Sequence, residues 1–179
     1  MDISDFTVCT VRYSRGNRKV NMSSARDLSR VKPLSNYQLD GKLKKLVPCY
    51  AGTFDKDSLP DLTGKKPCCI ILNTELDTTS TVGHWVAVVV DNHRNVHYFD
   101  SYGDPPKFIS WRIYLKKLDK NNYFTHSSAS IQPPDTNICG HLCIEFIVKR
   151  LSVSHRMLSD TAVAKSIDIY KAVEKYYNQ

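Results

Sequence analysis

The sequence lacks any long hydrophobic run. Its longest apolar segments are residues 68–72 and 85–90, whereas a membrane-spanning helix needs roughly 20 apolar residues. We therefore expect no transmembrane segment. The opening residues, MDISDFTV, have neither a basic region nor a long apolar core, so no secretory signal peptide is predicted. We expect an intracellular protein in a reducing compartment, not a secreted one.

The six cysteines lack the spacing of a metal site. Cys68 and Cys69 are adjacent, Cys139 and Cys143 are four residues apart, and no C-x-x-C pair occurs, so no metal site is predicted. In a reducing compartment the cysteines are expected to be thiols rather than a disulfide framework. At least one of them is a candidate for a reactive thiol.

The composition is that of one globular domain. The chain has 179 residues, of which 41% are hydrophobic and 24% charged, and this predicts a packed core. The net charge of +7 favours contact with polyanions or acidic surfaces. Polar residues 1–33 are interpreted as a basic N-terminal arm, ahead of a domain at residues 34–179. The basic residues of this arm are Arg12, Arg15, Arg18, Lys19, Arg26, Arg30 and Lys32.

Hydrophobic periodicity predicts helices and strands without a βαβ repeat. Leucines at helical spacing predict a helix at residues 34–46, capped by Ser35 or Asn36. Apolar and β-branched runs predict strands, and apolar stripes predict further helices. The predicted strands are residues 68–73, 84–90, 96–100 and 128–132, and the further helices are 107–118, 139–151 and 160–177. This mixture predicts an α+β fold.

The strands at residues 84–90 and 96–100 flank the short turn DNHRN and are predicted to form a hairpin. A turn centred near His93 pairs residues whose numbers add up to about 185 or 186. His84 and Asp100 then lie nearly opposite each other at the open end of the hairpin. A carboxylate beside an imidazole fixes its tautomer and stabilises its charged form, which suits a general base. The alternative is that both residues simply end their strands.

The segment IQPPDTNICGHLC holds a candidate nucleophile, Cys139. Cys139 stands at a predicted helix start, where unpaired amides favour a thiolate, and Gly140 leaves the backbone open to a substrate. Gln132 offers an amide N–H to a developing oxyanion, beside the backbone N–H of Cys139. The alternatives are a buried, unreactive Cys139 and an exposed loop glutamine. For Cys143, one helical turn further on, burial is the better interpretation.

Three motifs follow one another along the chain: GHW, then YFDSYG, then Q-x6-CG. In this order they resemble the adenovirus-type (adenain) and Ulp1-like cysteine proteases, most closely the adenovirus-like proteases of eukaryotic DNA viruses and of Polinton/Maverick elements. The likeness covers residues 34–150 and implies an adenain/Ulp1-like α+β fold. The functional residues that it implies are His84, Asp100 and Cys139 as catalytic triad, Gln132 in the oxyanion hole, and Trp85 and Gly140 in support.

The resemblance implies a cysteine endopeptidase that cleaves viral or virus-like precursor proteins at small-residue, glycine-containing sites. The same triad also fits an isopeptidase of the deubiquitinase or deSUMOylase type, and this alternative stays open. A third alternative is a non-catalytic nucleic-acid-binding module that uses the basic arm, although no RRM, KH or zinc-finger signature occurs.

The resemblance also implies partners and surroundings. We expect protein substrates, nucleic acid as a further partner of the basic arm, and no membrane contact. No cofactor is expected to be required, with DNA or a peptide as an optional activator. We expect a monomer in the host nucleus or cytoplasm, or in the virion. Trp85 is expected either to pack beside His84 or to serve in the core.

Overall fold

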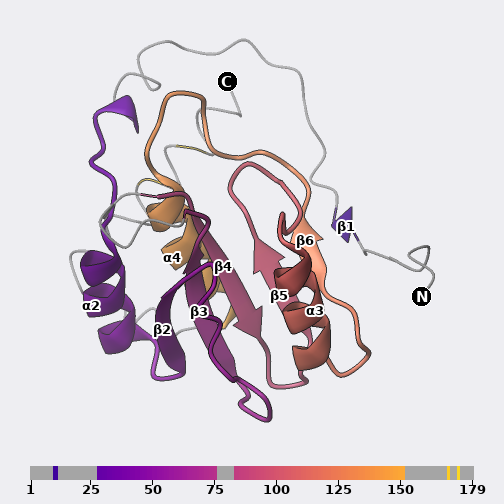
Figure 1. Cartoon of the computed structure of the whole chain (residues 1–179). Helices are drawn as coiled ribbons and strands as arrows, with labels where there is room; N and C mark the ends of the chain where they lie inside the picture. The colour runs from indigo at the N-terminus through magenta and orange to yellow at the C-terminus, as the bar shows by residue number, and fades with distance from the viewer. Residues whose placement is uncertain (1–9, 12–27, 76–82, 152–168, 170–172, 174–179) are drawn as a thin grey trace.

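A mixed β-sheet forms the centre of the protein in a computed structural model that describes residues 10–11, 28–75, 83–151, 169 and 173 (Figure 1). Its strands are β1 (Thr10–Val11), β2 (Tyr50–Asp55), β3 (Cys68–Asn73), β4 (Trp85–Val90), β5 (Val96–Phe99) and β6 (Thr125–Ser127). They lie in the order β1-β6-β5-β4-β3-β2. The pairs β3–β4 and β4–β5 are antiparallel, and the other three pairs are parallel.

Helices cover both faces of this sheet. They are α2 (Asn36–Leu46), α3 (Ile109–Leu118) and α4 (Cys139–Arg150). Every residue of β3 and β4 is buried, and side chains that alternate along these strands enter two separate cores. Ile71 packs in the core shared with α2 and α4, whereas its neighbour Ile70 packs in the core shared with α3. The central strands are therefore fixed from both sides (Figure 1).

Helix α2 shows how local sequence sets an element. The Ser35 hydroxyl accepts a hydrogen bond from Gln38 N, and the Gln38 side chain accepts one from Ser35 N, which forms a capping box. The buried face consists of Leu39, Leu43 and Leu46. The predicted helix and its cap are thus confirmed. Among the described residues, no helix is long and apolar enough to cross a membrane.

The α+β class is confirmed, as are most of the predicted elements. Strands β3, β4 and β5 and helices α3 and α4 lie where the sequence predicts them, with small shifts at their ends. The antiparallel hairpin of β4 and β5 is confirmed as well. The helix predicted at residues 160–177 lies outside the described residues, apart from Ile169 and Val173, which are helical and buried.

Three strands differ from the prediction, and one of them is β1, which lies in the predicted arm. The prediction of a strand at residues 128–132 is wrong. Strand β6 lies earlier in the chain and pairs with β5 through Thr125 and His126. The backbone N–H groups of Ile131 and Gln132 instead both donate to the carbonyl of Ser101. Strand β2 was not predicted; it contains Gly52 and pairs in parallel with β3, from which residues 56–67 separate it in the chain.

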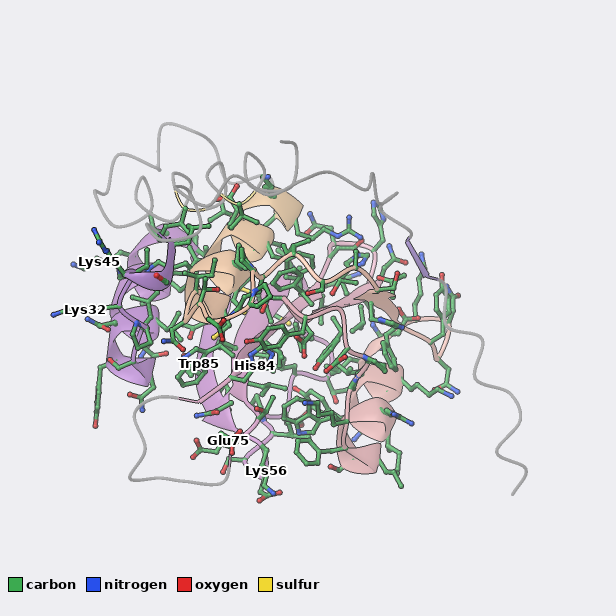
Figure 2. The ribbon with its side chains drawn as sticks, turned by 90° about the horizontal axis from the view of Figure 1, so that it is seen from above. Lys32, Lys45, Lys56, Glu75, His84 and Trp85 are labelled. Carbon is green, nitrogen blue, oxygen red and sulfur yellow. The ribbon has the colours of Figure 1, made fainter. Side chains whose placement is uncertain are left out.

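Parts of the predicted N-terminal arm contact the domain. Strand β1 pairs with β6, and Leu28 is buried in the core shared with α2 and α4. Lys32 lies at the end of the arm, and its side chain points outward, as does that of Lys45 on α2 (Figure 2). The domain boundary at residue 33 stays a prediction.

Candidate active site

The β4–β5 hairpin sets the register of the candidate site. Its pairs run from Val90↔Val96 to Ala87↔Phe99, so the paired residue numbers add up to 186, within the predicted range. Continued past the strand ends, this register places Tyr102 opposite His84, with Asp100 on the same face. The rings of Tyr102 and His84 do stack, with centroids 4.8 Å apart and planes at 27°.

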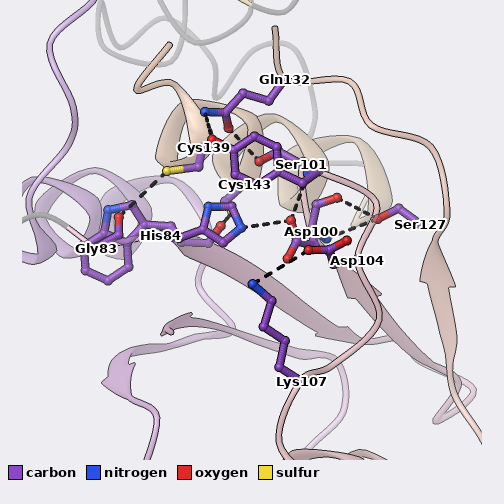
Figure 3. A network of polar contacts seen from close by, with 12 residues as sticks. Gly83, His84, Asp100, Ser101, Asp104, Lys107, Ser127, Gln132, Cys139 and Cys143 are labelled. Carbon is purple, nitrogen blue, oxygen red and sulfur yellow. Dashed lines mark hydrogen bonds and ion pairs between the residues drawn. The ribbon is translucent and has the colours of Figure 1, made fainter. Parts of the chain in front are cut away.

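Asp100 is a buried carboxylate that binds His84. The Nε2 atom of His84 lies 2.9 Å from Oδ1 of Asp100 (Figure 3), and Asp100 is 1% exposed. The Asp100 backbone N–H donates to Ser127 Oγ, and the Ser127 hydroxyl donates back to the Asp100 carbonyl. Gly103 N donates to the same carbonyl. These bonds fix the backbone of Asp100 and so position its carboxylate. The carboxylate orients the imidazole and leaves Nδ1 of His84 for another partner.

Opposing influences set the protonation of His84. Burial disfavours the charged ring, but the hydrogen bonds and charges of Asp100 and Cys139 outweigh burial and raise the pKa of His84 to about 9. The ring is therefore protonated at neutral pH and loses its proton as the pH rises through about 9. A positively charged ring at this position is the partner that a cysteine nucleophile requires.

We expect Asp100→Asn to lower the pKa of His84, because the substitution removes the negative charge while burial continues to disfavour the imidazolium. NMR titration of the imidazole resonances measures the shift. The matched control is Asp104→Asn, since Oδ2 of Asp104 lies 3.7 Å from Nζ of Lys107 in a solvent-exposed ion pair. A His84 pKa that stays near 9 in Asp100→Asn would contradict the role of Asp100.

Cys139 is the first residue of α4, at the helix start that the sequence predicts. Ile138, the N-cap residue, provides no side-chain hydrogen bond, so no side chain at this position neutralises the N–H groups of the first turn. Those groups favour negative charge on the Cys139 sulfur. Sγ lies 4.0 Å from the carbonyl oxygen of Gly83, the residue before His84 (Figure 3). Cys139 is 8% exposed, so little of it meets solvent.

Gln132 is buried behind the site, with its amide fully engaged. Its Oε1 accepts a hydrogen bond from the Ser101 hydroxyl at 2.7 Å, and its Nε2 donates to the Thr136 carbonyl at 2.6 Å. Nε2 also donates to the Tyr102 hydroxyl at 3.1 Å. Gln132 is 3% exposed, so the alternative of an exposed loop glutamine is wrong. Its role toward an oxyanion stays a prediction.

Trp85 and Gly140 belong to the packing behind the nucleophile. Trp85 neighbours His84 at the start of β4 (Figure 2), is 2% exposed, and donates from Nε1 to the Leu34 carbonyl. The ring that stacks on His84 is that of Tyr102, and Trp85 takes the core role. Gly140 is buried, and its absent side chain leaves room for helix packing. A Cβ there would lie 3.2–3.4 Å from atoms of Trp85, Leu34 and Leu39.

The sequence interpretation missed several residues of the site. Ser101 and Thr136 hold the amide of Gln132 from both ends, and Ser127 holds the backbone of Asp100. Tyr102 contacts the ring of His84 directly. The hairpin register contained a signal for Tyr102, since the same numbering rule places it opposite His84. Nothing in the local sequence indicated the contacts of Ser101 and Ser127, which join segments far apart in the chain, or the contact of Thr136, which is four residues from Gln132.

Other thiols of the described chain are distinguishable from Cys139. Cys143 is buried and donates from Sγ to the Trp85 carbonyl at 3.3 Å, and burial raises its pKa well above the usual thiol value. A hydrogen bond from Cys69 lowers the pKa of half-buried Cys49 to about 7.

No group of three or more His, Cys, Asp or Glu side chains within the described residues is arranged to hold a metal ion.

Comparisons with known proteins give distant structural similarities. No protein-family model and no curated protein matches the chain. The central domain of the uncharacterized Lpg1148 protein from Legionella pneumophila is similar at 10% identity and a TM-score of 0.44, over 83% of this chain and 98% of that one. The Chlamydia abortus effector ChlaDUB is similar at 18% identity and a TM-score of 0.33, over 61% of this chain and 57% of that one.

The SUMO protease Ulp1, solved with its catalytic cysteine oxidized to a sulfonic acid, is similar at 15% identity and a TM-score of 0.32. The match covers 61% of this chain and 54% of that one, so the chain spans little more than half the length of Ulp1 and of ChlaDUB. At these identities and TM-scores the similarities do not identify an activity. The resemblance to adenoviral and Polinton/Maverick proteases stays a prediction from the sequence motifs.

Proposed function

We propose that the protein is a cysteine peptidase in which Cys139 is the nucleophile, His84 the general base and acid, and Asp100 the residue that orients His84. The observation that carries this proposal is the environment of the His84 ring. A buried carboxylate binds its Nε2 at 2.9 Å, and the Cys139 sulfur also favours the charged ring. A nucleophile, a base and an orienting carboxylate are the parts that covalent acyl transfer requires.

The proposed reaction has two halves. His84 carries the proton of Cys139, and the thiolate attacks the scissile carbonyl carbon, so that an S–C bond forms and the carbonyl electrons move to oxygen. Collapse of this tetrahedral intermediate breaks the C–N bond, and the His84 imidazolium gives its proton to the leaving amine. Water then attacks the thioester and gives a proton to His84, the S–C bond breaks, and the acid is released with the Cys139 thiolate and the His84 imidazolium restored. The Cys139 backbone N–H stabilises the oxyanion, together with a side-chain donor in the neighbourhood of Gln132.

The substrate proposed is a small-residue, glycine-containing site in a viral or virus-like precursor protein. The low exposure of the site supports this choice, because Cys139 is 8% exposed and the His84 side chain 15% exposed. A bulky residue next to the scissile bond would meet the surrounding side chains, whereas glycine would let the substrate backbone approach the sulfur. An isopeptidase acting on ubiquitin-like tails would use the same chemistry.

A cleavage profile on a peptide library, with ubiquitin-like fusion proteins assayed in parallel, tests the proposed function. We expect cleavage after small residues, with peptides containing Gly at or next to the cut enriched among the products. Cleavage confined to ubiquitin-like fusions would favour the isopeptidase. Absence of hydrolysis of every peptide and fusion by the full chain would contradict the proposal and favour a non-catalytic role.

A further inference from the structure

Tyr102 contacts three of the four residues proposed to carry the chemistry. Its ring stacks on His84, its backbone N–H donates to Oδ1 of Asp100 at 2.8 Å, and its hydroxyl accepts from Nε2 of Gln132 at 3.1 Å. Tyr102 is also 44% exposed. It therefore lies between the buried parts of the site and the solvent from which a substrate arrives.

The amide orientation of Gln132 follows from its partners. The Thr136 carbonyl can only accept a hydrogen bond, so the atom 2.6 Å from it must be the NH₂ group. The opposite atom, Oε1, takes the hydroxyl hydrogen of Ser101. An amide has two N–H bonds, and those of Gln132 go to Thr136 and Tyr102. With Gln132 3% exposed, neither N–H is open to a substrate.

The Tyr102 hydroxyl can supply a hydrogen-bond donor, whereas both N–H donors of Gln132 are already engaged. A phenol has one O–H donor and acceptor lone pairs, and the bond from Gln132 occupies the acceptor side. Within the described part of the chain, no protein acceptor takes the hydroxyl hydrogen. Burial, together with the negative charges of Cys139 and Asp100, raises the pKa of Tyr102, so the hydroxyl keeps its hydrogen at neutral pH. A hydroxyl that accepts a hydrogen bond is polarised into a stronger donor.

We propose that the Tyr102 hydroxyl donates the side-chain hydrogen bond to the oxyanion, and that Gln132 is the positioning residue that holds and polarises it. This inference rests on the proposed function and names a catalytic residue for it. When the Cys139 thiolate adds to the carbonyl carbon, the carbonyl π electrons move to oxygen, and the O–H of Tyr102 bonds to that oxygen without transferring its proton. The bond weakens again when the carbonyl re-forms and the C–N bond breaks.

Tyr102→Phe tests this role because it removes the hydroxyl and retains the ring that stacks on His84. We expect kcat/KM for peptide cleavage to fall by roughly 100-fold, the usual cost of losing one oxyanion donor. The matched control is Tyr37→Phe, since Tyr37 is 79% exposed on α2 and should keep the parent rate. A Tyr102→Phe variant with parent kcat/KM, or a faster one, would overturn the proposal, the latter by showing that the hydroxyl blocks Gln132.

Alkylation of Cys139 by iodoacetamide separates a donor from a structural role. Alkylation forms no oxyanion, so Tyr102→Phe should leave the rate of Cys139 modification unchanged while peptide cleavage falls. A parallel fall in both rates would mean that Tyr102 merely positions His84 or Cys139, and would overturn the donor assignment. Mass spectrometry of the Cys139 peptide is the readout, because Cys49 also has a lowered pKa.

A double-variant cycle that combines Tyr102→Phe with Gln132→Ala tests whether Gln132 acts on the oxyanion through the Tyr102 hydroxyl or independently of it. If Gln132 acts through the Tyr102 hydroxyl, Tyr102→Phe combined with Gln132→Ala should cost no more than the larger single loss. Multiplicative losses would show two independent donors and would contradict the positioning role. Failure of the proposed function is distinguishable from failure of this inference, because in that case the parent chain itself hydrolyses no peptide.

Discussion

Replacing Cys139 by alanine is expected to abolish peptide hydrolysis, with a loss in kcat of roughly 10⁴-fold or more, because no other group supplies the nucleophile. The fold should persist, since the side chain is small and lies at the start of α4 rather than in its middle. Cys139→Ser should be similarly inactive because the hydroxyl is a much weaker nucleophile at neutral pH. A fluorogenic peptide assay measures the rate, and thermal unfolding by circular dichroism checks the fold.

The matched control is Cys143→Ala, one turn further along α4. Cys143 is completely buried and donates to the Trp85 carbonyl, so its replacement should lower stability by about 1 kcal/mol and leave the chemistry in place. Hydrolysis at the parent rate by Cys139→Ala would contradict the assignment of the nucleophile. Loss of activity in a folded Cys143→Ala variant would also contradict it, because the reaction would then depend on the Cys143 thiol.

His84→Ala should have the second largest effect. We expect hydrolysis to fall by roughly 10⁴-fold, because His84 carries the proton in both halves of the proposed reaction. With the pKa of His84 raised to about 9, the imidazolium is present beside the Cys139 sulfur below that pH and is lost above it. Alkylation of Cys139 by iodoacetamide at neutral pH should therefore slow in the variant, since the positive charge that favours the thiolate is gone.

The matched control is His93→Ala in the β4–β5 turn, where His93 is exposed and its recorded hydrogen bond is made by the backbone N–H to Asp91. Peptide-resolved mass spectrometry across a pH series follows Cys139 separately from Cys49, whose pKa is lowered to about 7. Identical pH profiles of Cys139 alkylation in the parent chain and in His84→Ala would rule out the pairing of the two residues.

Local signals explain why much of the fold was predictable. The cap at Ser35, the leucines of α2 and the β-branched run of β4 each act within a few residues. The hairpin register follows from its short turn, in which Asp91 accepts from the backbone of His93 and of Asn95. That register also brought His84 and Asp100 to the same end of the hairpin, so the pair was predictable without a structure.

The parts that failed depend on contacts between distant segments. The strand expected at residues 128–132 was predicted from local composition. In the structure, Thr125–Ser127 forms the strand instead, because these residues pair in parallel with β5. The backbone around Gln132 is instead held by Ser101. The sequence indicated Gln132 by its distance from Cys139, but it gave no sign that both N–H bonds of the amide have partners within the protein.

Trapping the acyl-enzyme tests the central claim most directly. The full chain would be mixed with an activated peptide ester, quenched in acid within the first turnover, digested, and analysed by mass spectrometry. The account predicts one acyl group on the peptide that contains Cys139, present in the parent chain and absent from Cys139→Ala. An acyl group on any other residue, or hydrolysis of the ester that persists in Cys139→Ala, would contradict it.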